Sequence, residues 1–317
     1  MSLTSSLLRR ARTPLLVLAL APAMSCSVAA KTLEVGPDKT YKLPSAAIAA
    51  AGDGDKILIA AGEYFDCAIV PANNLTIEGT GPDASAVMTD KTCGGKGLLV
   101  TTGKNITVRN LTLTRARVPD GNGAGIRSEG EGLTVERVKF VNNQNGLLAN
   151  PTPQGQIIIR NSEFIRNGAC NPACAHGIYV NELALLRIEN SKFTETRNAH
   201  HIKSRAARTE VIGCDISDGP NGTASYEIDI PNGGSLVLRD SRLEKGPKAE
   251  NHSAAISIGA EGVNQMTREI TIANNSFRNA GNFPTTFVVN MTATEAMLKG
   301  NKLSGTVEPL KGDGEVQ

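Results

Sequence analysis

A motif that recurs along nearly the whole chain limits the possible folds more than any other feature. Three of its copies are residues 106–113 (ITVRNLTL), 157–164 (IIIRNSEF) and 186–193 (LRIENSKF). The anchor position of the motif returns every 23 to 34 residues, at Gly79, Asn110, Arg137, Asn161, Asn190, Gly213, Asp240, Asn274 and Gly300. A period of about 20 to 50 residues is the signature of a solenoid, in which each repeat packs on its neighbours.

The residues around the anchors predict strands. Two residues before the last eight anchors stand aliphatic residues: Val108, Val135, Ile159, Ile188, Val211, Leu238, Ile272 and Leu298. Three residues after them stand Leu113, Phe140, Phe164, Phe193, Ile216, Leu243, Phe277 and Leu303. Apolar alternation on both sides of the anchor indicates a strand, a one-residue bend and a second short strand. Asn and Gly suit the bend because both tolerate left-handed backbone conformation.

A further β segment recurs between the anchors. Its copies are GIRS at 125, GLLA at 146, GIYV at 177, HIKS at 201, EIDI at 227, AISI at 255 and TFVV at 286. Because the second and fourth positions are mostly apolar, we expect the first and third to point outward. The first positions are Gly125, Gly146, Gly177, His201, Glu227, Ala255 and Thr286. The third positions are Arg127, Leu148, Tyr179, Lys203, Asp229, Ser257 and Val288.

The N-terminal residues predict export. Three arginines at positions 9, 10 and 12 precede an apolar stretch from residue 15 to 24, and small residues follow at 28–30. This order is typical of a secretory signal peptide, so we assign residues 1–30 to a leader and 31–317 to one domain, secreted or periplasmic. The apolar stretch is too short to span a bilayer and no later one is longer, so we expect no membrane span. A lipid anchor on Cys26 is the alternative.

The net charge of the mature chain does not indicate a particular class of binding partner. Removing residues 1–30 removes three of the 33 Lys and Arg and none of the 31 Asp and Glu, leaving a net charge of about −1. Nucleic-acid binding therefore lacks its usual electrostatic basis. An acidic substrate would need a local basic patch.

Five cysteines follow the predicted leader, and export permits disulfides. Cys170 and Cys174 flank a short Pro-containing loop and are predicted to pair. Cys67 and Cys93 form a second candidate pair, and Cys214, inside a repeat, is expected to be a buried thiol. A zinc site of Cys170, Cys174 and His176 is the alternative, although no second half of such a motif follows.

Residues 43–64 (LPSAAIAAAGDGDKILIAAGEY) resemble the opening of right-handed parallel β-helix proteins of the pectate-lyase-like superfamily. The resemblance implies an all-β, single-stranded right-handed parallel β-helix with a polysaccharide groove. We expect the coil from about residue 55 to 305, a capping helix over 43–51 with Leu43, Ala47 and Ala50 on its packed face, and a frayed tail from 308. The superfamily includes lyases, epimerases, hydrolases, esterases and proteins without known chemistry. The Asp-Pro-His-Asp motif of alginate epimerases and the paired aspartates of polygalacturonases are both missing here, so the activity stays open.

The outward positions of the middle rungs predict an active patch. Rungs lie about 4.8 Å apart, so Tyr179, His201, Lys203, Glu227 and Asp229 would meet on one face. Such a set suits proton abstraction beside a uronate carboxylate, which needs a cation and a base. The candidate neutralising cations are Lys203, Arg205 and Arg127, and the candidate acids or bases are His201, Tyr179 and His176. The candidate substrate-binding residues are Arg127, His200, Tyr226, Glu227, Asp229 and His252.

We therefore expect an exported lyase or C5-epimerase of an acidic polysaccharide. Three alternatives stay open: a non-catalytic glycan-binding or surface scaffold, in which Lys203 and Asp229 form a plain ion pair; a glycoside hydrolase using Glu227 and Asp229; and a Ca²⁺ site formed by those two residues with Glu182 or Glu261. With four Tyr, seven Phe and no Trp, recognition through aromatic platforms is disfavoured, and polar or ionic recognition is expected.

Overall fold

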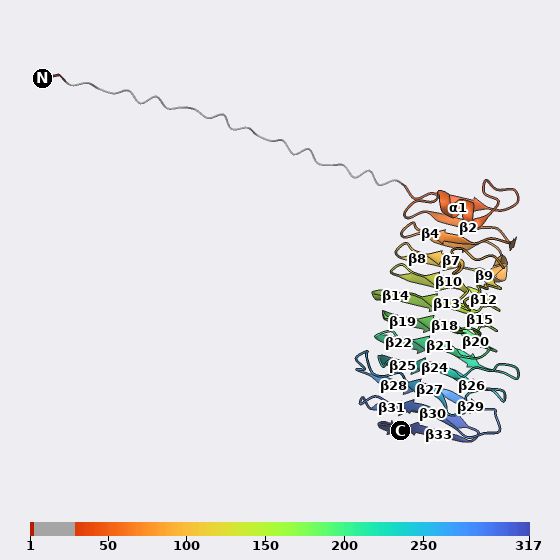
Figure 1. Ribbon diagram of the computed structural model, residues 1–317, viewed down its shortest axis with the longest axis vertical. Helices are drawn as coiled ribbons and strands as arrows, with labels where there is room; N and C mark the ends of the chain where they lie inside the picture. The colour runs from red at the N-terminus through yellow and green to blue at the C-terminus, as the bar shows by residue number, and fades with distance from the viewer. Residues whose placement is uncertain (3–28) are drawn as a thin grey trace.

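The chain is an elongated coil of short strands. The computed structural model describes residues 1–2 and 29–317 of the chain. Successive turns stack along one axis, with the helix α1 at one end and the C-terminus at the other (Figure 1). The predicted signal peptide falls almost entirely on residues 3–28, which lie outside the described residues. Among the residues described, no helix has the length and apolar character needed to cross a membrane.

Three parallel sheets form the walls of the coil, and each turn contributes one strand to each wall. The first sheet has twelve strands, in the order β1 (Thr32–Val35), β2 (Lys56–Ile59), β5 (Thr76–Gly79), β8 (Ile106–Arg109), β11 (Leu133–Glu136), β14 (Thr152–Arg160), β19 (Leu183–Glu189), β22 (Arg208–Ile212), β25 (Ser235–Arg239), β28 (Ile270–Ala273), β31 (Ala296–Lys299) and β34 (Gly314–Val316). The second has ten, in the order β3 (Gly62–Tyr64), β6 (Ala86–Thr89), β9 (Leu111–Thr114), β12 (Lys139–Val141), β15 (Glu163–Ile165), β20 (Lys192–Thr194), β23 (Asp215–Ser217), β26 (Arg242–Lys245), β29 (Ser276–Asn279) and β32 (Lys302–Ser304).

The third sheet contains the recurring segment between the anchors. Its ten strands follow the order β4 (Ala68–Val70), β7 (Gly97–Thr101), β10 (Ala124–Ser128), β13 (Asn145–Ala149), β18 (Ile178–Val180), β21 (His200–Ser204), β24 (Tyr226–Ile230), β27 (Ala254–Ile258), β30 (Thr285–Asn290) and β33 (Val307–Lys311). A small antiparallel hairpin, β16 (Ala169–Cys170) with β17 (Cys174–Ala175), projects beside it. The predicted all-β solenoid of parallel strands is confirmed.

The anchors make the bend between the first and second sheets. Eight of them have a positive φ: Asn110, Arg137, Asn161, Asn190, Gly213, Asp240, Asn274 and Gly300. Gly79 is the exception, since its φ is not positive; a β-carbon there would collide with the carbonyl oxygen of Asn110. Asn110 in turn donates its side-chain amide to the Gly79 carbonyl at 2.7 Å. Gly79 is thus required for close approach of two turns, not for its backbone conformation.

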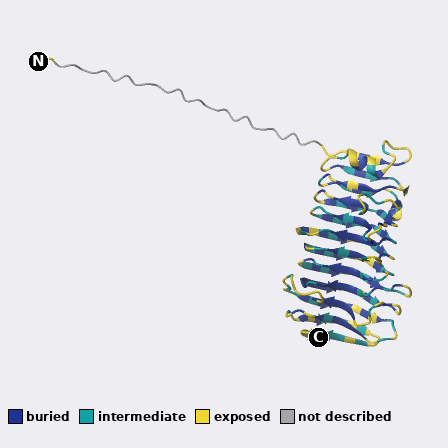
Figure 2. Cartoon of the chain, viewed as in Figure 1, coloured by how far each residue is buried: buried dark blue, intermediate teal, exposed yellow. Residues whose placement is uncertain are grey.

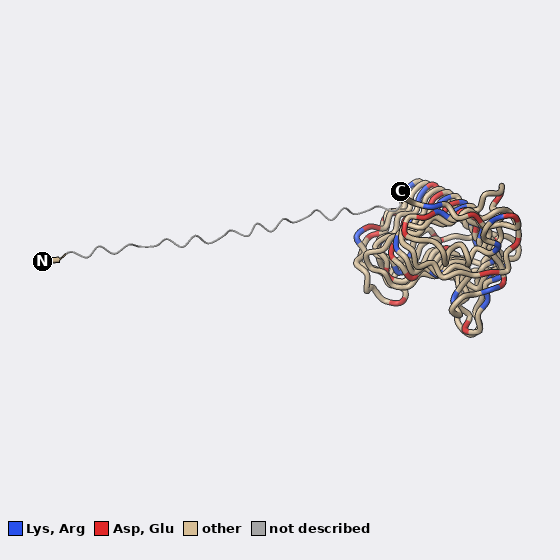
Figure 3. The backbone as a smooth tube through the Cα atoms, turned by 90° about the horizontal axis from the view of Figure 1, so that it is seen from above, with Lys and Arg blue, Asp and Glu red and all other residues tan. Residues whose placement is uncertain are grey.

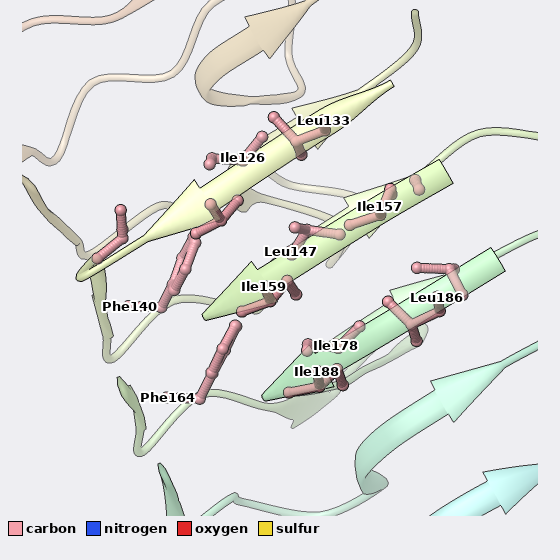
Figure 4. Packing of buried hydrophobic residues seen from close by; sticks show 14 of the residues in the cluster. Ile126, Leu133, Phe140, Leu147, Ile157, Ile159, Phe164, Ile178, Leu186 and Ile188 are labelled. Carbon is pink, nitrogen blue, oxygen red and sulfur yellow. The ribbon is translucent and has the colours of Figure 1, made fainter. Parts of the chain in front are cut away.

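The interior is one continuous apolar core. Phe140, Phe164 and Phe193 stack through three successive turns, with ring centroids 4.5 and 4.6 Å apart. Figure 4 shows Phe140 and Phe164 beside the aliphatic residues of the facing walls, and Figure 2 shows the buried residues along the inside of every turn. Because identical positions recur at the rung spacing, each apolar column fills the coil without gaps between turns.

Neither end of the coil matches its prediction fully. The helix α1 (Pro44–Ala50) packs on the first turns, but it buries Pro44, Ala47 and Ile48 while Leu43 and Ala50 are exposed. Leu43 is the N-cap residue and has extended backbone, so it lies outside the helix. At the other end the predicted frayed tail is wrong, because β33 pairs with β30 and β34 pairs with β31. A single-turn 3₁₀ helix, η1 (Pro82–Ala84), lies between β5 and β6.

Candidate functional site

The third sheet aligns the predicted third-position residues in one outward column. Tyr179 pairs in register with Lys203, and Lys203 with Asp229. Arg127 stands in the same column, separated from Tyr179 by Leu148. At the next turns Asp229 pairs with Ser257, and Ser257 with Val289. The expectation that Val288 faces outward is therefore wrong: Val288 is fully buried and pairs with Ile256.

The expectation that His201 and Glu227 face outward is also wrong. His201 is fully buried, its ring contacts Phe193 edge-on, and its nitrogens lie 2.7 Å from Thr196 Oγ1 and 3.0 Å from Asp218 Oδ1. Glu227 is fully buried and lies 3.4 Å from the equally buried Nζ of Lys245. The strand bends at this position, since the ladder pairs 200 with 226 and 202 with 228 but leaves 201 and 227 unpaired. The ladder also skips Gly125, Gly146 and the fully buried Ala255, so the period of two fails at the first position in other turns as well.

The outward neighbours of these buried residues are His176, His200 and Tyr226, which form a ring stack. The centroids of His176 and His200 are 4.9 Å apart, and those of His200 and Tyr226 are 5.0 Å apart. The backbone N–H of His200 donates to Nδ1 of His176, and that of Tyr226 donates to Nδ1 of His200. Because Nδ1 accepts in both rings, the neutral tautomer of each carries its proton on Nε2.

Two cations converge on the outer face above Tyr179. Arg205 Nε donates to the Tyr179 hydroxyl oxygen at 3.1 Å, and Arg205 Nη1 donates to Asn232. Lys203 Nζ lies 3.4 Å from Asp229 Oδ2 and 2.7 Å from Glu261 Oε1. The Lys203 ammonium and the Arg205 guanidinium lie 5.8 and 5.7 Å from the Tyr179 ring centroid. This is a compact cationic cluster around one phenol.

A pocket of about 510 Å³ opens on this cluster. Its lining is His176, Tyr179, Ala199, His200, Lys203, Ser225 and Glu250 together with the two cysteines of the hairpin. Cys170 and Cys174 form a disulfide, as the sequence predicted, and Cys67 and Cys93 form another. The hairpin of β16 and β17 thus forms one wall of the pocket, and the disulfide ties its two strands together.

Burial controls the protonation of the pocket residues. Burial lowers the pKa of His200 to about 3, assisted by the positive charge of Lys203. It also lowers the pKa of His176 well below its usual value. Both rings are therefore neutral at pH 7. Burial raises the pKa of Asp229 to about 6, although Lys203 opposes this shift.

Two predicted binding residues lie apart from the pocket. Arg127 donates to Asn150 at 2.6 Å and lies 3.5 Å from Glu129 Oε1, two turns away from Tyr179. His252 stacks on Phe283, with centroids 3.6 Å apart, and lines a separate pocket at the first residues of β30 and β33. Neither contacts the cluster around Tyr179. The buried thiol predicted at Cys214 is observed.

The metal hypotheses do not fit the geometry. Glu227 lies inside the coil against Lys245, whereas Asp229 lies on the outer face against Lys203, so the two carboxylates do not face one site. A Ca²⁺ site or a glycosidase pair built on them is therefore excluded. The zinc alternative is also wrong, since Cys170 and Cys174 are oxidised. Within the described residues, no group of three or more His, Cys, Asp or Glu side chains is placed to hold a metal ion.

The sequence did not predict the contacts of Asn232 and Glu261 with the cations. Both stand in loops, where no periodicity fixes the direction of a side chain. The sequence suggested Glu261 only as a possible calcium ligand, yet its two carboxylate oxygens bind Lys203 and Arg205. The loop between β27 and β28, residues 259–269, has no repeating pattern that could indicate this contact.

Sequence comparison identifies the family. The model of the "Right handed beta helix region" matches residues 69–216 and again residues 152–308, which together span well over half of the chain. The chain belongs to the right-handed β-helix family. The expected handedness of the coil is thereby confirmed, together with the resemblance to the pectate-lyase-like proteins. No curated protein matches the sequence.

Two solved structures share the fold of this β-helix protein. An alginate lyase from Paenibacillus sp. str. FPU-7 aligns with a TM-score of 0.63 and 18% identity, over 90% of this chain and 99% of the lyase chain. Pectate lyase Pel9A aligns with a TM-score of 0.57 and 14% identity, over 88% of this chain and 78% of the other. At these identities the similarity is one of fold.

Proposed function

We propose that this protein acts on a uronate-containing polysaccharide as a lyase or C5-epimerase. The observation that carries the proposal is the convergence of Lys203 and Arg205 on Tyr179. Lys203 pairs in register with Tyr179 and lines the pocket with it, and Arg205, just after the end of β21, donates to the Tyr179 hydroxyl. Removing the proton beside a carboxylate requires stabilisation of the enolate that forms. Two fixed cations next to a proton-transfer group supply that requirement.

In the proposed reaction Lys203 and Arg205 bind the uronate carboxylate. Tyr179 first gives its own proton to water, and its oxygen then takes the C5 proton. In a lyase the bond from C4 to the glycosidic oxygen then breaks, and the proton passes from Tyr179 to the departing oxygen. In an epimerase a water molecule on the opposite face gives a proton to C5 instead, and the hydroxide that remains takes the proton from Tyr179. His201, predicted as the base, has no part in this reaction because it is fully buried against Phe193 and Asp218.

The two outer histidines are binding groups in this proposal, not bases. Each uses Nδ1 to accept a backbone hydrogen bond, and each is neutral at pH 7 with its proton on Nε2. A ring in this state can donate to a sugar hydroxyl but cannot take a proton. Proton transfer therefore falls to Tyr179.

The comparisons support the substrate class. Both structural neighbours reported above carry names of lyases, one of alginate and one of pectate, and both polymers consist of uronic acids. The pocket also suits an acidic glycan, because its lining offers the Lys203 ammonium and two histidine rings beside one tyrosine, and Arg205 lies next to it on the Tyr179 hydroxyl. Recognition of this kind is ionic.

The test is the formation of unsaturated uronate, followed by absorbance, on a panel of uronate polymers with the wild-type protein and Lys203→Ala. We expect Lys203→Ala to lower turnover by about 10²–10³-fold with the fold retained. Lys139→Ala is the matched control, since it removes a Lys–Glu pair from the second sheet. Equal activity of Lys203→Ala and wild type would disprove the site. If no uronate polymer is altered and C5 does not exchange, the protein is a binding scaffold.

A further inference from the structure

The cationic cluster already holds a carboxylate, and that carboxylate belongs to the chain itself. Glu261 Oε1 lies 2.7 Å from Lys203 Nζ, and Glu261 Oε2 lies 2.6 Å from Arg205 Nη2. One carboxylate thus bridges both cations, with one oxygen on each. This is the geometry in which the proposed site would hold a uronate carboxylate.

The exposures of the three side chains differ in a way that permits exchange. The Lys203 side chain is 11% exposed and that of Arg205 is 20% exposed, whereas that of Glu261 is 47% exposed. Cations that are mostly buried need an anion beside them, because burial removes their hydration. An ion pair whose carboxylate is half in solvent contributes little and breaks readily. The cations are therefore fixed and the anion is replaceable.

The charges of the cluster favour a ligand with one negative charge. With Asp229 ionised, Lys203 and Arg205 are balanced by Asp229 and Glu261. When the Glu261 carboxylate leaves, the cluster keeps one net positive charge. A uronate residue carries one negative charge and restores the balance.

Only the side chain of Glu261 has to move. Its backbone N–H donates to the Pro231 carbonyl at 2.8 Å, and Gln265 N–H donates to the Asn232 carbonyl at 2.9 Å. These bonds tie the loop between β27 and β28 to the preceding turn. Rotation of the glutamate side chain into solvent would uncover the cations without opening the loop.

We propose that Glu261 is an internal competitor that occupies the carboxylate subsite of the free protein and is displaced by the substrate's uronate. This inference rests on the proposed function for the identity of the ligand. Glu261 then sets the affinity for substrate and the selectivity for anions. It takes no part in the proton transfer, so its removal should change KM and leave kcat nearly unchanged.

The test measures binding of glucuronate, a single uronic acid, by calorimetric titration of wild type, Glu261→Gln and Glu261→Ala. We expect both variants to bind glucuronate about tenfold more tightly than wild type, the effect of losing two partly exposed ion pairs. Glu269→Gln is the matched control: it removes the same charge at the end of the same loop, where Glu269 pairs with Arg208. Its affinity should equal that of wild type. Glucose should bind to none of them.

Unchanged or weaker glucuronate binding in both Glu261 variants would overturn the inference, as would an equal gain in Glu269→Gln. Because the readout is binding, it does not depend on turnover. If the Glu261 variants bind glucuronate more tightly but no polymer is altered, the proposed reaction is refuted and the role of Glu261 as a competitor stands. If a polymer is turned over and both variants have the KM of wild type, the proposed reaction stands and the role of Glu261 as a competitor is refuted.

Discussion

His200 and His201 are neighbours in sequence with opposite environments. His200 stacks between His176 and Tyr226 at the pocket, while His201 is fully buried beside Asp218 and Thr196. The difference comes from the backbone bend at the start of β21. A buried histidine with two hydrogen-bond partners shapes the interior, and an outer one can contact a ligand. The role of each side chain at the site thus depends on one backbone position.

The buried Glu227 should make the stability of the protein depend on pH. Burial raises its pKa to about 8, an effect that the nearby Lys245 reduces but does not cancel. A carboxyl whose folded-state pKa is raised contributes stability below its unfolded pKa and loses it as pH rises through the folded value. The free energy of unfolding of wild type should therefore fall relative to Glu227→Gln between about pH 4.5 and 8. Urea unfolding of both proteins at pH 5 and pH 8 measures this difference; an equal difference at both pH values would contradict it.

At the scale of the element, each strand contributes one layer to continuous columns. Phe164 of β15 lies between Phe140 of β12 and Phe193 of β20, with all three rings fully buried. Each layer supports the layers above and below it, so stability is distributed along the coil as nearest-neighbour contacts. The site lies on the outer face of one wall, which allows its residues to vary without disturbing these columns.

Replacing Phe164 tests this packing. We expect Phe164→Ala to lower the free energy of unfolding by about 3–5 kcal/mol, because it opens a cavity and removes two ring stacks. Phe65→Ala is the control, since Phe65 is 65% exposed. Chemical denaturation measures both. A loss from Phe164→Ala no larger than that from Phe65→Ala would mean that the column does not hold the turns together.

The sequence predicts the strands well because their signals repeat. The aliphatic residue before each anchor and the left-handed anchor itself recur in nearly every turn, and the structure follows them. Prediction failed where the backbone departs from the regular strand. The bend that buries His201 and Glu227 recurs at the same position in other turns, where Ala255 is also fully buried, and the position of Glu261 depends on loop contacts. The polar end strand β33 was missed because its pairing partner β30, not its own pattern, makes it a strand.

At the scale of the whole molecule, the coil is a rigid scaffold with mixed surface charge. Lys and Arg alternate with Asp and Glu around the walls instead of gathering by sign (Figure 3). Long-range attraction of an acidic polymer is therefore weak, and recognition depends on the few cations at the pocket. Two disulfides among the described residues agree with folding in an oxidising compartment.

The predicted signal peptide and the disulfides together predict the mass of the exported protein. We expect the protein recovered from a secreting host to begin near residue 31 and to contain two disulfides and one free thiol, that of the buried Cys214. Intact mass before and after alkylation under denaturing conditions measures both properties. A product that keeps residues 1–30, or one with five free thiols, would contradict the proposal.

The most direct test of the central claim follows the C5 proton itself. A uronate polymer that the protein accepts is incubated in D₂O with wild type and with Tyr179→Phe, and the sugar products are examined by NMR. We expect wild type to give either an unsaturated uronate end or deuterium at C5. Tyr179→Phe should form either product at least about 10²-fold more slowly. Chain cleavage by wild type to saturated ends with no deuterium at C5, or full activity of Tyr179→Phe, would contradict it.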